Sequence, residues 1–277
     1  MNVLEFTLVV WAGSLAAGLL GALTGLGGGV VIVPFLLALS VDMRYAIGAA
    51  LVSVIATSSG AAAAYVKEGY TNMRVGMFLE MATTLGALCG AYLGTRVLPT
   101  SAIAVVFGLV LLGSAWLSFR KREDHLADRP DPLATRLRLD GGYPTPAGWQ
   151  TYYVQRVPIG FGLMYVAGVL SGLLGIGSGA VKVLALDQAM QIPFKASTTT
   201  SNFMIGVTAA ASAGLYLHDG YISPGLSMPV MLGILPGALL GSKLLTRTKV
   251  AALRIVFGIV IAALAVQMIY LGLTGRA

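Results

Sequence analysis

Long apolar stretches alternate with short polar segments along the whole chain. A helix of about 20 apolar residues crosses a membrane, and runs of about this length occupy residues 6–26, 46–65, 75–97, 101–119, 196–217, 226–245 and 255–273. The first run has no basic residues before it and no convincing cleavage site, so we interpret it as a retained helix and not as a signal peptide. The pattern predicts an all-α polytopic membrane protein.

The composition agrees with this prediction. Hydrophobic residues make up 57% of the chain and charged residues only 10%, whereas soluble domains contain about 25% charged residues. The net charge of +7 is spread over the ends of the apolar runs, which is typical of cytoplasmic loops. We therefore expect the lipid bilayer as a partner and no nucleic acid. The one cysteine, Cys89, excludes an intrachain disulfide. We expect no cofactor and no metal site, and a homo-oligomer is possible.

Two glycine-rich clusters lie inside apolar segments, 150 residues apart. The first contains Gly27, Gly28 and Gly29, and the second contains Gly177, Ser178 and Gly179. Hydrocarbon offers no water to backbone amides, so non-helical backbone at membrane depth occurs only where protein buries it or where it lines a cavity. Two such breaks in matching halves of a transporter indicate a binding site, and we predict that all six residues contribute to it.

The two clusters belong to a longer internal repeat. The pattern Tyr-x-x-x-Gly-Tyr at residues 65–70 recurs at residues 216–221. We therefore predict a first transmembrane repeat over residues 1–119, a polar linker over 120–157 and a second transmembrane repeat over 158–277. The linker contains seven basic and five acidic residues, so the positive-inside rule places it in the cytoplasm.

The basic residues also bear on the number of crossings. Four crossings per repeat would put seven basic residues outside and three inside, leaving out the linker, whereas five crossings reverse these numbers. The count favours inverted repeats with a 5+5 arrangement. The fifth crossing must come from residues 28–40 and 179–191, which reach only roughly 20 Å as helices. We predict short or broken helices there; eight spans in a 4+4 arrangement with re-entrant segments are the alternative.

One lysine lies within the apolar region that follows the second glycine cluster. Placing Lys182 at the centre of a membrane helix costs on the order of 3 kcal/mol, which favours a role in binding an anion. A snorkelling side chain or a structural pair with Asp187 is the alternative, and Asp187 is also a candidate charge partner when no anion is bound. Glu80 is a second candidate for coupling or charge pairing; its position six residues after Arg74 predicts a shallow, solvated carboxylate.

A polar run opens the apolar segment at residues 196–217. Its members predicted to contact a polar solute are Thr198, Thr199, Thr200, Ser201 and Asn202. The alternative is that the hydroxyls bond carbonyls of their own helix and that the amide joins helices. No nucleophile, base and orienting group converge in the sequence, so we predict no catalytic residues and no enzyme. An intramembrane enzyme acting on a lipid or a small polar substrate is the alternative function.

The glycine clusters and the polar run resemble those of the sulfite exporter TauE/SafE family of bacterial permeases. The first cluster with Pro34 matches the Gly-rich cluster of that family, and Ala196 with Thr199 and Thr200 matches its Ala-x-x-Thr-Ser signature. The resemblance implies a multi-pass permease of the bacterial inner membrane. It implies transport of a small sulfur-containing anion such as sulfite, a sulfonate or sulfoacetate, by alternating access.

Overall fold

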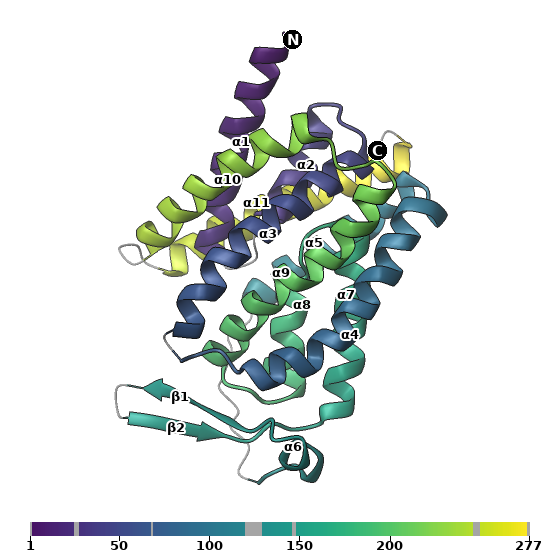
Figure 1. The fold of residues 1–277 in the computed structure, drawn as a ribbon. Helices are drawn as coiled ribbons and strands as arrows, with labels where there is room; N and C mark the ends of the chain where they lie inside the picture. Colours follow the sequence, from purple (N-terminus) through teal and green to yellow (C-terminus); the bar gives the residue numbers. More distant parts are fainter. Residues whose placement is uncertain are drawn as a thin grey trace.

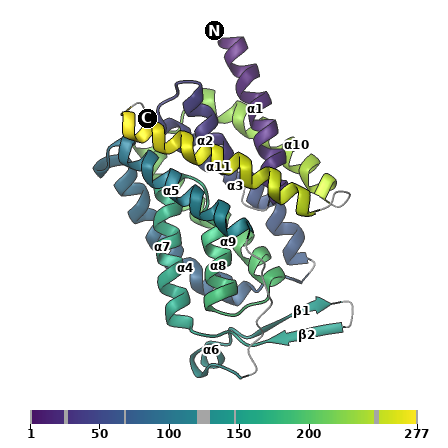
Figure 2. The ribbon, with the colours of Figure 1, turned by 180° about the vertical axis from the view of Figure 1, so that it is seen from behind.

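The chain folds into a bundle of helices with a small hairpin at one end (Figure 1). The structure, a computed structural model, describes residues 2–24, 28–67, 69–119, 129–145, 148–245 and 250–275. The hairpin and the short helix α6 lie at the end of the bundle away from the N-terminus, in both views (Figures 1 and 2).

Each half of the chain contributes a series of helices of unequal length. The first half forms α1 (Val3–Thr24), α2 (Gly29–Ala38), α3 (Met43–Lys67), α4 (Met73–Tyr92) with its π-helical end η1 (Leu93–Val97), and α5 (Thr100–Phe119). The second half forms α7 (Val157–Leu174), α8 (Gly179–Leu184) with its π-helical end η2 (Ala185–Ala189), α9 (Phe194–His218), α10 (Pro224–Leu245) and α11 (Val250–Thr274). Short helices therefore follow both glycine clusters, as the lengths of those segments predict.

The helices pair across the two halves. Helix α1 packs on α10, α4 on α7, α5 on α11 and α3 on α9, and both views show α4 beside α7 (Figures 1 and 2). Glycines make these approaches close: a Cβ on Gly86 or Gly90 of α4 would overlap the backbone of Tyr165 or Val169 of α7. These small residues let the two backbones touch, as in other membrane helix pairs.

The outer surface of the bundle is apolar. On α4, the exposed side chains Met77, Met81 and Leu85 follow one another at intervals of one turn, while Leu79 and Gly86 face inward. Three of the described helical segments are long and apolar enough to cross a membrane, namely Val3–Gly21, Met73–Val97 and Val157–Leu174, and five further apolar segments, on α2, α3, α5, α10 and α11, are 10–17 residues long. Apolar residues pointing outward on such helices fit a lipid environment.

The linker is more ordered than a polar loop. Its described part contains α6 (Pro132–Arg136) and an antiparallel hairpin of β1 (Gly141–Thr145) and β2 (Gly148–Tyr152), in which Tyr143 pairs with Gln150. The prediction of an all-α fold is corrected to this extent, because hairpin strands this short carry no clear alternating pattern. Asn72 donates to Tyr152 at 2.9 Å, and burial raises the pKa of Tyr152 to about 12.

The two ends of the α3/α9 pair carry similar contacts. At one end, Arg44 of α3 lies 5.5 Å from the ring centroid of Tyr221, which follows α9. At the other end, Lys195 of α9 lies 5.5 Å from the ring centroid of Tyr70, which follows α3. Arg44 also donates to Tyr221 at 3.1 Å and to the carbonyls of Gly94 and Leu98, both at 3.2 Å.

An ion pair adds to the contacts at the Arg44 end. Arg96 donates to both carboxylate oxygens of Asp219, at 2.6 and 3.3 Å. The guanidinium holds the pKa of Asp219 well below its usual range, because it donates hydrogen bonds to the ionised carboxylate. The hydrogen bonds that cross between the halves at this end run from Arg44 to Tyr221 and from Arg96 to both oxygens of Asp219, whereas at the Lys195 end the backbone amide of Asn72 donates to Thr200 at 3.0 Å.

Candidate functional site

Lys182 lies in α8, and its side chain is 0% exposed. Its Nζ donates to Oγ1 of Thr208 in α9 at 2.6 Å. The Thr208 hydroxyl lies 2.7 Å from Oε1 of Glu80 in α4 and 2.8 Å from the carbonyl of Met204, and it donates its one hydrogen to either acceptor. A lysine, a threonine and a glutamate from three helices thus form one buried polar chain.

Glu80 is buried, which corrects the expectation of a shallow, solvated carboxylate. Only 8% of the residue is exposed, and Thr84 donates to Oε1 at 3.3 Å. The other oxygen, Oε2, is buried and has no hydrogen-bond partner among the described residues. Glu80 is only six residues from Arg74 along the helix, but it is buried because α7 and α9 both pack against α4 and cover it.

Asp187, the other predicted charge partner, lies in η2. It is 6% exposed, and Gln188 donates to its Oδ2 at 3.0 Å. The carboxylate that the structure links to Lys182, through Thr208, is Glu80. A pairing of Lys182 with Asp187 stays a prediction.

The two glycine clusters lie against each other. A Cβ on Gly29, the first residue of α2, would lie 3.0 Å from the carbonyl oxygen of Gly175 and 3.5 Å from Cα of Ile176. The side chain of Val54 in α3 lies beside both clusters. A Cβ added to Gly29 would lie 2.8 Å from it, and a Cβ added to Gly177 would lie 3.3 Å from it. Gly28 is buried beside them, whereas the predicted site residue Gly27 lies outside the described residues.

The second cluster interrupts the helix between α7 and α8. Gly175, Gly177 and Ser178 all have positive φ values, of 69°, 71° and 49°, in the left-handed region that glycine enters without strain. Gly179 then begins α8. The Ser178 hydroxyl is buried and makes no hydrogen bond within the described part of the chain. The break therefore places an unsatisfied hydroxyl one turn before Lys182.

Most hydroxyls of the polar run on α9 bond to nearby carbonyls. Thr198 donates to Phe194 at 2.9 Å and Thr199 to Lys195 at 3.0 Å, which is the common arrangement in membrane helices. The hydroxyls of Thr200 and Ser201 join α9 to neighbouring segments. Thr200 accepts from the backbone amide of Asn72 at 3.0 Å, and Ser201 donates to the carbonyl of Gly179 at 3.4 Å. Asn202 is half-buried, and the structure shows no hydrogen bond from its side chain to another described residue. Contact of these residues with a solute stays a prediction.

Comparison with known proteins identifies the family. The family model described as "Sulfite exporter TauE/SafE" matches residues 10–268. The chain belongs to the sulfite exporter TauE/SafE family. Its relatives include the probable membrane transporter protein YunE of Bacillus subtilis, which is 26% identical over 98% of this chain and 99% of its own length.

Other TauE/SafE relatives are as distant in sequence. A probable membrane transporter protein of Xylella fastidiosa is 25% identical over 98% of this chain and 97% of its own length. The probable membrane transporter protein MJ0441 of Methanocaldococcus jannaschii is 22% identical over 91% of both chains. No solved structure matches the chain. The family and these relatives make the chain a membrane transporter.

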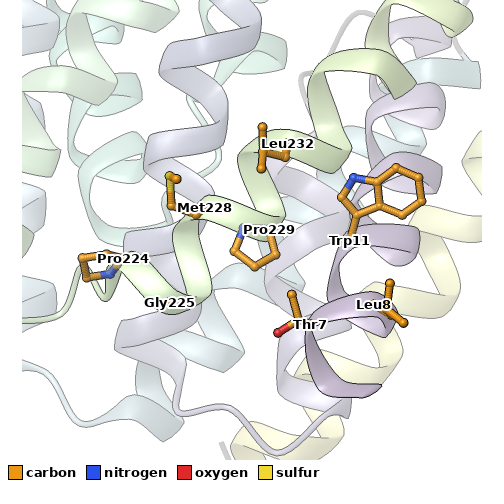
Figure 3. Close-up of a pocket in the computed structure, with 8 residues that line it drawn as sticks. All are labelled: Thr7, Leu8, Trp11, Pro224, Gly225, Met228, Pro229 and Leu232. Atoms are coloured by element: carbon orange, nitrogen blue, oxygen red, sulfur yellow. The ribbon is translucent and has the colours of Figure 1, made fainter. Parts of the chain in front are cut away.

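A cavity on the side of this TauE/SafE protein is not the polar site. It has a volume of about 680 Å³ and lies between α1 and α10 (Figure 3). Its lining is Thr7, Leu8, Trp11, Pro224, Gly225, Met228, Pro229 and Leu232. The hydroxyl of Thr7 donates to the Val3 carbonyl at 2.8 Å, so the lining offers little to an anion.

Sequence reasoning missed Thr208, the residue that joins the two buried charges. Thr208 follows Ser201 by seven residues, so both lie on the same face of α9 as a helix of 3.6 residues per turn predicts. This seven-residue spacing is the feature of the sequence that could have identified Thr208 as a site residue. Among the described residues, no group of three metal-ligating side chains is present.

Proposed function

We propose that this chain is a secondary transporter that moves a small, sulfur-containing oxyanion across the bacterial inner membrane, with Lys182 as the positive charge that binds it. Membership of the TauE/SafE family supports transport. The observation that carries the choice of an anion is the complete burial of Lys182 among apolar helices. Ionisable residues at such positions are costly and mark substrate or ion pathways.

The contacts of Lys182 suit an oxyanion. Thr208 accepts one of the three hydrogens of the ammonium group among the described residues, so two hydrogens are available to the oxygens of a ligand. The hydroxyl of Ser178, four residues earlier, is buried without a hydrogen-bond partner in the described structure. Ser178 directly precedes α8, and its carbonyl accepts from the backbone amide of Lys182 at 3.0 Å, so the two residues are one turn apart. We place the anion beside these two side chains and the second glycine cluster.

The proposed mechanism is alternating access in a multi-pass protein of inverted 5+5 repeats. The pairing of helices supports it, since α1 packs on α10 and α7 on α4. In such a repeat α1 corresponds to α7 and α4 to α10, so a two-fold rotation exchanges these two pairs. The same rotation exchanges the two helices within the α3/α9 pair and within the α5/α11 pair. Rocking of one half against the other would then open the site to each side in turn.

Anion flux into proteoliposomes that contain only this protein tests the proposal. Sulfite, sulfoacetate and methanesulfonate serve as probes, and wild type is compared with Lys182→Met and Lys182→Arg. We expect flux with wild type, loss of flux in Lys182→Met, and partial retention in Lys182→Arg because the charge is kept. Equal flux in wild type and Lys182→Met would refute the role of Lys182. No flux of any of the three anions with wild type would refute the transporter proposal for this substrate class.

A further inference from the structure

The buried polar chain of Lys182, Thr208 and Glu80 holds one positive and one negative charge when both ends are ionised. We propose that Glu80 is the proton-binding group of the transporter, so that a proton on Glu80 and an anion on Lys182 are taken up together. The inference rests on the proposed function, because it needs an anion that binds at Lys182. It identifies the proton as the ion that is transported together with the anion.

The charge balance of the site carries the argument. With Glu80 ionised, the pair is neutral, and a monovalent anion that binds beside Lys182 leaves one uncompensated negative charge in a buried place. Uncompensated buried charge is strongly unfavourable. A proton bound to Glu80 removes that charge, since Lys182 and the anion then neutralise each other. Anion binding and protonation of Glu80 therefore favour each other, and this linkage is reciprocal.

The geometry of Thr208 lets the chain accommodate both states. When Glu80 is ionised, the Thr208 hydroxyl donates to Oε1 at 2.7 Å. When Glu80 is protonated, the same hydroxyl turns to the Met204 carbonyl at 2.8 Å and keeps its bond from Lys182 at 2.6 Å. The change needs only rotation about one bond. Oε2 of Glu80, which is buried without a partner in the described structure, is the oxygen left to take the proton.

Lys182 is the charged group that faces Glu80. Helix α4 packs on α7, α9 and η1, and the hydroxyls that bond the Glu80 carboxylate come from α4 and α9, namely Thr84 and Thr208. Among the other titratable groups of these elements, Tyr165 of α7 bonds Cys89 at 3.4 Å, and Arg96 of η1 pairs with Asp219. Lys195 and His218 lie at the two ends of α9, and Asp187 of η2 accepts from Gln188. The positive charge of Lys182 is therefore the electrostatic influence that governs proton binding by Glu80.

The linkage has a measurable size. If one proton accompanies one anion, the apparent affinity for the anion falls about tenfold for each unit of pH above the range in which Glu80 is protonated. A monovalent anion carried with one proton moves no net charge, so its uptake responds to a pH gradient and not to membrane voltage.

Counterflow and net uptake in proteoliposomes test the proposal, using each of the three probe anions that the wild type carries. In Glu80→Gln, whose amide resembles a protonated carboxyl, we expect a pH-independent KM for exchange and loss of accumulation driven by an inward proton gradient. Proton uptake, followed with a trapped pH dye, is scored as the difference between wild type and Glu80→Gln, which cancels buffering by the anion. Glu80→Asp keeps a titratable carboxylate in a different position, so it should keep the pH dependence with a shifted midpoint.

The outcomes separate the two proposals. Equal pH dependence in wild type and Glu80→Gln, with anion flux present, would overturn the role of Glu80 and leave the proposed transport standing. Absence of flux for all three anions in wild type would overturn the proposed function and the coupling with it. If Glu80→Gln does not fold, Glu80→Asp decides, because an unchanged pH midpoint there would also overturn the role of Glu80.

Discussion

The buried pair of Lys182 and Glu80 should show strong energetic coupling in a double-mutant cycle of Lys182→Met, Glu80→Gln and both together. Each charged group lies within 2.7 Å of the Thr208 hydroxyl, so the two charges are roughly 5 Å apart. At an effective dielectric constant of about 20, such charges attract by about 3 kcal/mol. Removing one partner leaves the other uncompensated, which typically costs 3–5 kcal/mol. The double variant removes both charges and should lose less than the sum of the two single variants.

Equilibrium unfolding of the purified protein by SDS in mixed micelles measures these differences. We expect a coupling free energy of about 2–3 kcal/mol at pH 8. The matched control is a cycle at the more exposed pair Arg96 and Asp219, with Arg96→Met and Asp219→Asn, whose coupling should be smaller because water screens it. Additive losses for Lys182→Met and Glu80→Gln would show that the two groups are not a charge pair, and the argument for linked proton and anion binding would fall.

Three further predictions concern packing, pH and topology. Gly90→Ala should destabilise the protein by about 2 kcal/mol through overpacking between α4 and α7, while Gly162→Ala, where a Cβ meets nothing within 4 Å, should not; thermal unfolding in detergent distinguishes them. The pKa of Asp219 is lowered, so its ion pair stabilises the fold above the usual aspartate range and is lost only as the pH falls below it; the Tm difference between wild type and Asp219→Asn should stay constant from pH 7 to about pH 4. In a Cys89→Ala background, an impermeant thiol reagent added outside should label Asp219→Cys and not Trp149→Cys, and the reverse pattern would contradict a cytoplasmic linker.

The helical membrane fold and the location of Lys182 within an apolar segment could be predicted because both depend on local composition. A lysine among apolar residues is visible in the sequence, and so is a glycine cluster that interrupts a membrane helix. The short helices α2 and α8 follow from the same reading. Close packing at Gly86 and Gly90 also follows, since residues four apart form one stripe on α4.

The partner of Lys182 could not be predicted in the same way. Asp187 is the nearest carboxylate in the sequence, but Glu80 reaches Lys182 only because α4, α8 and α9 meet. Exposure of Glu80 also depends on α7 and α9, which cover it. The linker hairpin was missed for a different reason: its short strands contain glycine, proline and exposed polar residues, whose local preferences favour turns.

Under the proposed alternating-access mechanism, the unequal contacts at the two ends of the α3/α9 pair should bias the relative populations of the two facing states. Separation of the halves at the Arg44 end breaks the hydrogen bond from Arg44 to Tyr221 and the ion pair of Arg96 with Asp219. At the other end, Lys195 contacts the ring of Tyr70, and the backbone amide of Asn72 donates to the hydroxyl of Thr200 at 3.0 Å. A ligand moves such an equilibrium only by its differential affinity for the two states. We therefore expect the empty transporter to rest closed at the Arg44 end, so that its resting occupancy is biased toward one compartment before any substrate binds.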